Sequence, residues 1–90
     1  MDKGSIASGS FFVFRYLKQN SPSFAVVASK KIAKTAVKRN FLRRRGYNII
    51  RLFNTKSGPG IFFYKKEGLN VEFSELKKDI EFIFKKSGII

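Results

Sequence analysis

The sequence contains no cysteine and no histidine, and only six of its 90 residues are aspartate or glutamate. Without cysteine or histidine the chain has no disulfide, zinc finger, thiol nucleophile or imidazole acid–base catalyst. No apolar run approaches the roughly 20 residues needed to cross a bilayer, and the first twenty positions do not resemble a signal peptide. These absences predict a soluble protein of the cytoplasm with no membrane partner.

The few carboxylates are also placed poorly for metal-dependent chemistry. Five of the six follow Lys66, and four of those five accompany Lys77 and Lys78, as in ordinary helix salt-bridge patterning. Metal-dependent nucleases hold their ions with clustered carboxylates. The sequence shows no acid pair, no nucleophile beside a base and no phosphate-cradling glycine loop. We therefore expect the isolated protein to break no bonds, to hold no metal and to bind no cofactor through a motif of its own.

Positive charge is what the sequence has in excess, with 19 Lys+Arg and a formal net charge of +13. Between Lys3 and Lys66 there are fifteen basic residues and no acid, and nine of the fifteen lie between Lys30 and Arg51. A solubilising surface normally intersperses the two signs, whereas an acid-free stretch repels itself unless a polyanion compensates it. Nucleic acid is the expected polyanion, and an anionic membrane surface is the lesser alternative.

Length and composition indicate one small folded domain. Ninety residues have room for a single core of about two helices and a three- or four-stranded sheet. A chain that is 43% hydrophobic and 16% aromatic is too apolar for a disordered polycation. We expect residues 1–90 to form a single domain of the α+β class that binds nucleic acid, with no repeat or linker.

Hydrophobic periodicity predicts the order β-β-α-β-α, preceded by a short edge strand. Residues 19–22 form a turn signal, which favours an antiparallel hairpin between the strands on either side. The last strand follows a strand–helix pair, so it can lie parallel to one of the earlier strands. The expected strands are residues 5–7, 11–17, 24–29 and 61–65, and the expected helices are 32 or 35 to 53 and 71 or 74 to 86.

Both helices are expected to be amphipathic. At 100° per residue one arc of the first helix gathers six apolar residues, which we expect to be buried: Val37, Phe41, Leu42, Ile49, Leu52 and Phe53. Lys38 and Arg45 fall inside that arc, so either their stems snorkel or Gly46 interrupts the helix. In the second helix the expected buried set is Phe73, Leu76, Ile80 and Phe84, joined by Phe82 and Ile83.

One segment is specific enough to indicate a family. Ser29-Lys30-Lys31 ends a strand, and a short spacer leads to Val37-Lys38-Arg39-Asn40-Phe41-Leu42-Arg43-Arg44 on the long helix. This pattern resembles the protein component of bacterial ribonuclease P, in which two lysines precede Arg-Asn-Arg-aliphatic-Lys/Arg-Arg. The flanking elements agree, and the resemblance covers roughly residues 4–87. It implies a left-handed β-α-β crossover, although right-handed ones are the general rule.

The sequence departs from the family pattern in three respects. Phe41 stands where the family has the second arginine of Arg-Asn-Arg, and Arg45 occupies a position that is usually aliphatic. Family members begin with a helix that carries two phenylalanines, and the present sequence starts after it, either because the lineage has lost that helix or because this start lies downstream of the real one. The question matters to the resemblance, because those rings help to wall the groove that holds the leader.

The resemblance implies the cofactor protein of a catalytic RNA that cleaves the 5′ leader from precursor tRNA. The protein would be a non-catalytic subunit, Mg²⁺ would sit on the RNA, and the partners would be the catalytic RNA and precursor tRNA, with no obligate protein partner. The main alternative is a small basic ribosomal protein that binds structured rRNA. A DNA-binding module, a membrane-surface peptide and an independent metal nuclease fit less well.

Two sets of residues are candidates for RNA contacts. The resemblance places the catalytic RNA along the basic helix and the strand end before it, where the candidates are Lys30, Lys31, Lys34, Lys38, Arg39, Asn40, Arg43, Arg44 and Arg51. A groove between sheet and helix would hold the single-stranded leader by stacking on aromatic rings. The ring candidates share one strand face, with core packing as their alternative role: Phe12, Phe14 and Tyr16.

Overall fold

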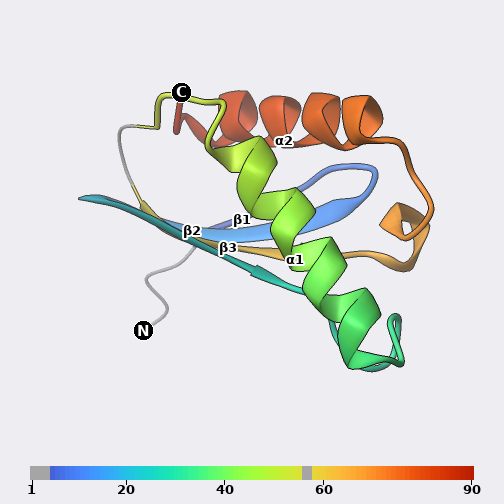
Figure 1. Cartoon of the computed structure of the whole chain (residues 1–90). Coiled ribbons are helices and arrows are strands. Elements are labelled where there is room, and N and C mark those ends of the chain that lie inside the picture. Colours follow the sequence, from blue (N-terminus) through green and yellow to red (C-terminus); the bar gives the residue numbers. More distant parts are fainter. Residues whose placement is uncertain (1–4, 56–57) are drawn as a thin grey trace.

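The computed structural model describes residues 5–55 and 58–90, excluding the side chains of residues 18–22, and it has two layers (Figure 1). The sheet contains β1 (Ser5–Ser8), β2 (Phe12–Val27) and β3 (Gly58–Tyr64). Two helices, α1 (Ala36–Ile50) and α2 (Phe73–Ser87), cover one face of the sheet. A short 3-10 helix, η1 (Lys66–Gly68), leads from β3 toward α2. The α+β class is confirmed.

The long strand β2 lies on both sides of β3. Its first arm, residues 12–16, pairs with residues 64 to 60 in descending order and is therefore antiparallel to β3. Its second arm, residues 24–27, pairs with residues 60 to 63 in ascending order, which is the parallel sense. Because β1 pairs with the first arm, the sheet has four strand positions in the order β1, first arm, β3, second arm.

The predicted hairpin is therefore wrong in its pairing, although the chain does reverse direction between the two arms. The arms do not pair with each other because β3 is inserted between them, about 30 residues later in the sequence. A turn signal reports only a reversal, and it carries no information about a third strand. The prediction that the last strand lies parallel to an earlier one is confirmed. The left-handed sense of the β2–α1–β3 crossover stays a prediction of the resemblance.

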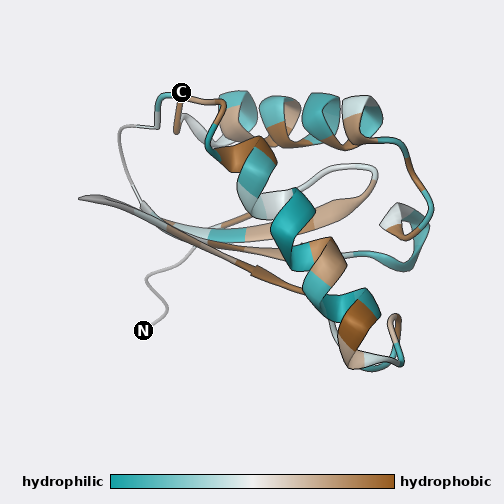
Figure 2. Cartoon of the chain, in the orientation of Figure 1, coloured by the Kyte–Doolittle hydropathy of each residue, from teal (hydrophilic) through white to brown (hydrophobic). Residues whose placement is uncertain are grey.

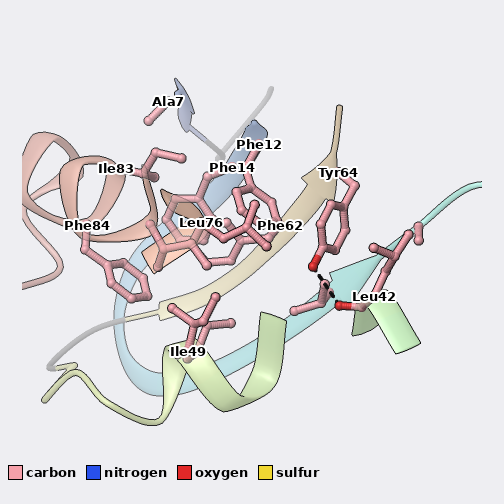
Figure 3. Close-up of a cluster of buried hydrophobic side chains, with 14 of the residues drawn as sticks. Ala7, Phe12, Phe14, Leu42, Ile49, Phe62, Tyr64, Leu76, Ile83 and Phe84 are labelled. Carbon is pink, nitrogen blue, oxygen red and sulfur yellow. Dashed lines mark hydrogen bonds between the residues drawn. The ribbon is translucent and has the colours of Figure 1, made fainter. Parts of the chain in front are cut away.

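A cluster of aromatic rings fills the space between the sheet and the helices (Figure 3). Phe14 stacks on Phe62 with ring centroids 4.2 Å apart, and the edge of Phe84 meets Phe14 at 5.8 Å. Phe12 meets Phe62 edge to face at 5.6 Å. All four rings have no accessible surface. This cluster joins both strands to α2 and forms the centre of the core.

Helix α1 begins at an N-cap, and the face that it turns to the core overlaps with the predicted one only at Leu42 and Ile49. Thr35 caps the helix by accepting from the Lys38 backbone N–H at 3.1 Å, which is the favoured N-cap chemistry. The buried residues are Leu42, Gly46, Ile49 and Ile50. Three members of the predicted apolar arc are instead exposed: Val37 by 80%, Phe41 by 51% and Leu52 by 57%.

Gly46 explains the shifted face of α1. A Cβ atom at Gly46 would lie only 2.8 Å from Cγ1 of Val26, so the helix approaches the second arm of β2 most closely where it has no side chain. The buried arc is therefore centred on a glycine. A prediction from the positions of apolar side chains misses such an arc, because glycine has no side chain. Gly46 does not interrupt the helix, and Lys38 and Arg45 lie half-buried at its margins.

Helix α2 matches its predicted bounds closely. Leu76, Ile80 and Phe84 are buried as expected, while Phe73 and Phe82 are exposed, contrary to the prediction. Gly88 ends the helix with a φ of 79°, which is the usual left-handed cap. Asp79 is one of the four acids for which the sequence predicts helix salt-bridge patterning, but it is buried and accepts from the backbone N–H groups of residues 10 and 11, at 2.7 and 3.0 Å. The carboxylate thereby fixes the β1–β2 turn to α2.

Tyr64 connects β3 to α1. Its hydroxyl donates to the Leu42 carbonyl at 2.7 Å (Figure 3). Burial raises the pKa of Tyr64 to about 12, and the Coulombic effect of Arg45 partly opposes the rise. Because the folded pKa lies above the unfolded value of 10.0, the neutral ring stabilises the fold fully below pH about 10, and this contribution is lost as the pH rises toward 12.

We expect the parent protein to lose about 1 kcal/mol more stability between pH 9 and pH 11 than Tyr64→Phe does, because phenylalanine has no proton to release in the unfolded chain. Urea unfolding at the two pH values measures the difference. At neutral pH the same variant should be about 1 kcal/mol less stable, since it lacks the hydrogen bond. Parallel pH profiles for the two proteins would contradict the raised pKa.

Candidate nucleic-acid interface

The outward face of α1 and the loop before it carry most of the predicted RNA-binding residues. The exposed members are Lys30, Lys31, Lys34, Asn40, Arg43, Arg44 and Arg51. Lys38 and Arg39 are half-buried. Helix α1 contains no acidic residue, and in the described part of the chain both side-chain ion pairs lie on α2. The basic groups of this face are therefore not neutralised by carboxylates within ion-pair distance in the described residues.

Arg39 has a positioning role in addition to its charge. The backbone N–H of Ala33 donates to the Ser29 carbonyl at 3.0 Å, which forms a turn between β2 and α1. The Arg39 guanidinium donates through Nη1 to the Ala33 carbonyl at 2.9 Å. Arg39 thus ties the lysine-bearing loop to the helix, and other N–H donors of its guanidinium are not used in this contact.

Asn40 and Arg43 form a pair one helical turn apart. Arg43 donates through Nη2 to Oδ1 of Asn40. This bond orients the amide of Asn40 and holds the guanidinium beside it. The amide N–H groups and the remaining guanidinium donors suit phosphate and 2′-hydroxyl oxygens. The structure thus brings together two neighbours of the sequence motif as one group of donors.

A groove lies between the second arm of β2 and the first turns of α1. It has a volume of about 280 Å³ and is lined by Val26, Val27, Ala28, Ala36, Arg39, Asn40 and Arg43. A second hollow of about 310 Å³ continues along α1 and is lined by Asn40, Arg43, Arg44 and Tyr47. The two hollows share Asn40 and Arg43. A groove between sheet and helix is therefore present, and its walls are basic on the helix side. That such a groove holds the leader stays a prediction.

The predicted leader-binding rings do not line this groove, and two of them are wrong as contacts. Phe12 and Phe14 have 0% of their surface exposed, so neither ring can stack on a base. Tyr16 is half-buried and stacks on Phe14 with centroids 5.2 Å apart. The physical reason is that both helices cover the sheet face to which these side chains point.

The opposite face of the sheet carries side chains that the sequence argument did not select. Two rows cross all four strand positions, namely Ile6–Arg15–Ile61–Ala25 and Ser8–Val13–Phe63–Val27. Ile6, Ile61 and Val27 are exposed and Phe63 is half-buried. No described helix packs on this face (Figure 1). The sequence could have identified this face, because alternate residues of β2 point to opposite sides of the sheet. Two helices cover only one side of a sheet this small, so the other set of side chains stays open.

Arg45 has a structural contact that accounts for its unusual position. Its guanidinium donates through Nη1 to the Val71 carbonyl at 2.9 Å and lies 5.3 Å from the centre of the Phe41 ring. Arg45 therefore ties α1 to the segment that precedes α2. An aliphatic side chain at this position could not make that link.

Two further properties concern only the described residues. In residues 5–55 and 58–90, no three histidine, cysteine, aspartate or glutamate side chains come together as a metal-binding group. No helix of the described chain has the length and apolar character of a membrane span.

Figure 2 shows hydrophilic residues along much of α1 and apolar residues along the strands beneath it.

Comparisons with known proteins agree with the pattern in α1. A family model described as Ribonuclease P matches residues 1–88. The ribonuclease P protein components of Thermus aquaticus and Thermus oshimai are 31% and 30% identical over 88 residues. These matches cover 98% of this chain but 54% and 58% of the relatives, so the chain spans little more than half of their length.

Solved structures share the same fold. The RNase P protein of Staphylococcus aureus has a TM-score of 0.81 at 16% identity, covering 97% of this chain and 84% of that one. The RNase P protein from Thermotoga maritima has a TM-score of 0.82 at 19% identity, covering 93% of this chain and 84% of that one. At these identities the structures establish a common backbone arrangement.

Proposed function

This chain belongs to the ribonuclease P protein family, and we propose that it is the protein subunit of a ribonucleoprotein that removes the 5′ leader from precursor tRNA. The RNA subunit would bind Mg²⁺ and carry out the hydrolysis. The protein would act in the cytoplasm by binding two RNA molecules. The observation that carries the proposal is the basic outward face of α1, whose arginines have no carboxylate partner in the described structure.

The outward face of α1 is the proposed contact with the catalytic RNA. Arginine forks bind phosphates through two donors, while lysines act as point charges. The exposed Arg43 and Arg44 stand beside Asn40, and the turn held by Arg39 presents Lys30 and Lys31 at the start of the helix. A continuous basic surface of this kind suits the backbone of a structured RNA.

The open face of the sheet is the proposed contact with the leader. Its apolar rows suit the flat faces of unpaired bases, and Arg15 adds a charge for the backbone. Val27 belongs to this face and also lines the groove that holds Arg39, Asn40 and Arg43. The two surfaces therefore meet at the second arm of β2. A single-stranded leader on the sheet would lie next to the RNA held by α1.

Reconstitution with the catalytic RNA of the same genome tests this function. We expect the protein to stimulate cleavage of precursor tRNA by the catalytic RNA at low Mg²⁺. We also expect it to favour leader-bearing over mature tRNA, because the open face of the sheet adds a contact that only the leader can use. Arg15→Ala should reduce that preference, while Lys77→Ala on α2 serves as a control of equal charge change. No stimulation, with equal affinity for both tRNAs, would favour a ribosomal protein. Cleavage by the protein alone would refute catalysis by the RNA.

A further inference from the structure

An exposed aromatic ring lies within the basic surface of α1. Phe41 is 51% exposed, and it lies within the motif that carries the predicted RNA-binding residues. Its neighbours one turn away on the same side of the helix are Val37, Lys38, Arg44 and Arg45. A large apolar side chain beside three cations gains nothing from exposure to water. Its placement suits a partner that offers both an apolar surface and negative charge.

The Phe41 ring is held in place from one side. The Arg45 guanidinium lies 5.3 Å from the ring centre, and the same guanidinium is fixed by its bond to the Val71 carbonyl. Arg45 is half-buried, while half of the Phe41 surface stays accessible. The cation–π contact thus positions the ring against the protein and leaves its outer surface open. A ring that is oriented before binding loses little conformational entropy when it stacks.

We propose that Phe41 is a stacking site for an unpaired nucleobase of the RNA bound along α1, with Arg44 and Lys38 binding the phosphates on either side of that base. This inference rests on the proposed function, because it concerns the same RNA surface. An unpaired nucleotide combines a flat apolar base with an anionic backbone, which matches a ring among cations. A protein partner is disfavoured, because it would have to bury these cations, and α1 has no acidic residue to pair with them.

The proposal separates Phe41 from the arginines by salt dependence. A phosphate contact releases counterions, so its loss makes the plot of log affinity against log salt less steep. A stacked base releases none, so its loss lowers the affinity by the same factor at every salt concentration. Phe41→Leu should therefore weaken binding to the catalytic RNA about tenfold, or about 1.4 kcal/mol, with an unchanged salt slope.

Conservative and reporter variants make the test specific to an aromatic ring. Phe41→Tyr should keep the affinity of the parent within about twofold. The sequence has no tryptophan, so Phe41→Trp supplies a single tryptophan whose emission should be quenched when the catalytic RNA binds. Val37→Ala on α1 and Leu52→Ala just beyond its end are matched controls, because both side chains are exposed apolar groups. Each control should bind within about twofold of the parent.

Four results would overturn the proposal. Parent-like affinity of Phe41→Leu would show that the ring makes no contact, and unquenched Phe41→Trp in a bound complex would show the same even if the leucine variant folded poorly. An equal loss in Val37→Ala or Leu52→Ala would indicate a general apolar face. Failure of the parent itself to bind the RNA would refute the proposed function and, with it, this inference. Because binding of the parent is measured first, failure of the proposed function can be distinguished from failure of the inference about Phe41.

Discussion

Phe14→Ala is expected to lower the free energy of unfolding by about 3–5 kcal/mol, the cost of removing a buried phenylalanine from a packed core. Phe14 has no exposed surface and meets the rings of Tyr16, Phe24, Phe62 and Phe84. A domain of this size has a total stability of about 4–14 kcal/mol. Urea unfolding should show a large fall in midpoint, and a protein near the lower bound would be mostly unfolded.

The matched control is Phe82→Ala, which removes the same side chain from the exposed side of α2. Its stability should change by no more than about 0.5 kcal/mol. Phe14→Leu keeps most of the buried volume, so it should fold and should retain the leader preference of the parent. A well-folded Phe14→Leu protein that lost the preference for leader-bearing tRNA would restore Phe14 as a leader contact. Equal effects of the two alanine variants would refute the central position of Phe14 in the core.

Replacing Arg43 and Arg44 together by alanine is expected to weaken binding to the catalytic RNA about 100-fold. Both side chains are exposed on α1 and line the hollow that continues from the sheet–helix groove. Hydrogen bonds to charged groups contribute about 1.5–3 kcal/mol each, so the loss of two such contacts accounts for this magnitude. The slope of log affinity against log salt should become shallower by about 1.5. Titration of labelled RNA at several salt concentrations measures both quantities.

A control for net charge is available on α2. Lys77→Ala with Lys78→Ala removes the same two positive charges from an exposed surface on another helix. We expect this double variant to lose much less affinity, because long-range attraction without contact is screened over about 10 Å at moderate salt. Equal losses in the two double variants would show that total charge, and not the face of α1, determines RNA binding. Circular dichroism should show helix content unchanged in both, since alanine favours helix.

The sequence was sufficient for the composition-level conclusions and for the motif on α1. An acid-free run of basic residues predicts a polyanionic partner whatever the fold, since charge acts at long range. The spacing from Lys30 to Arg44 lies within one local unit, a strand end followed by a helix, so its geometry depends little on the rest of the chain. The helix caps at Thr35 and Gly88 are local for the same reason, because each depends only on residues within one turn of the helix end.

Only the tertiary structure decided which faces are buried and which strands are neighbours. Phe14 and Phe63 are alike in sequence terms, yet one lies beneath the helices and the other on the open side of the sheet. The buried arc of α1 is centred on Gly46, because the helix packs closest to Val26 where it lacks a side chain. Burial and strand order depend on contacts between residues far apart in the chain, and periodicity within one segment does not contain that information.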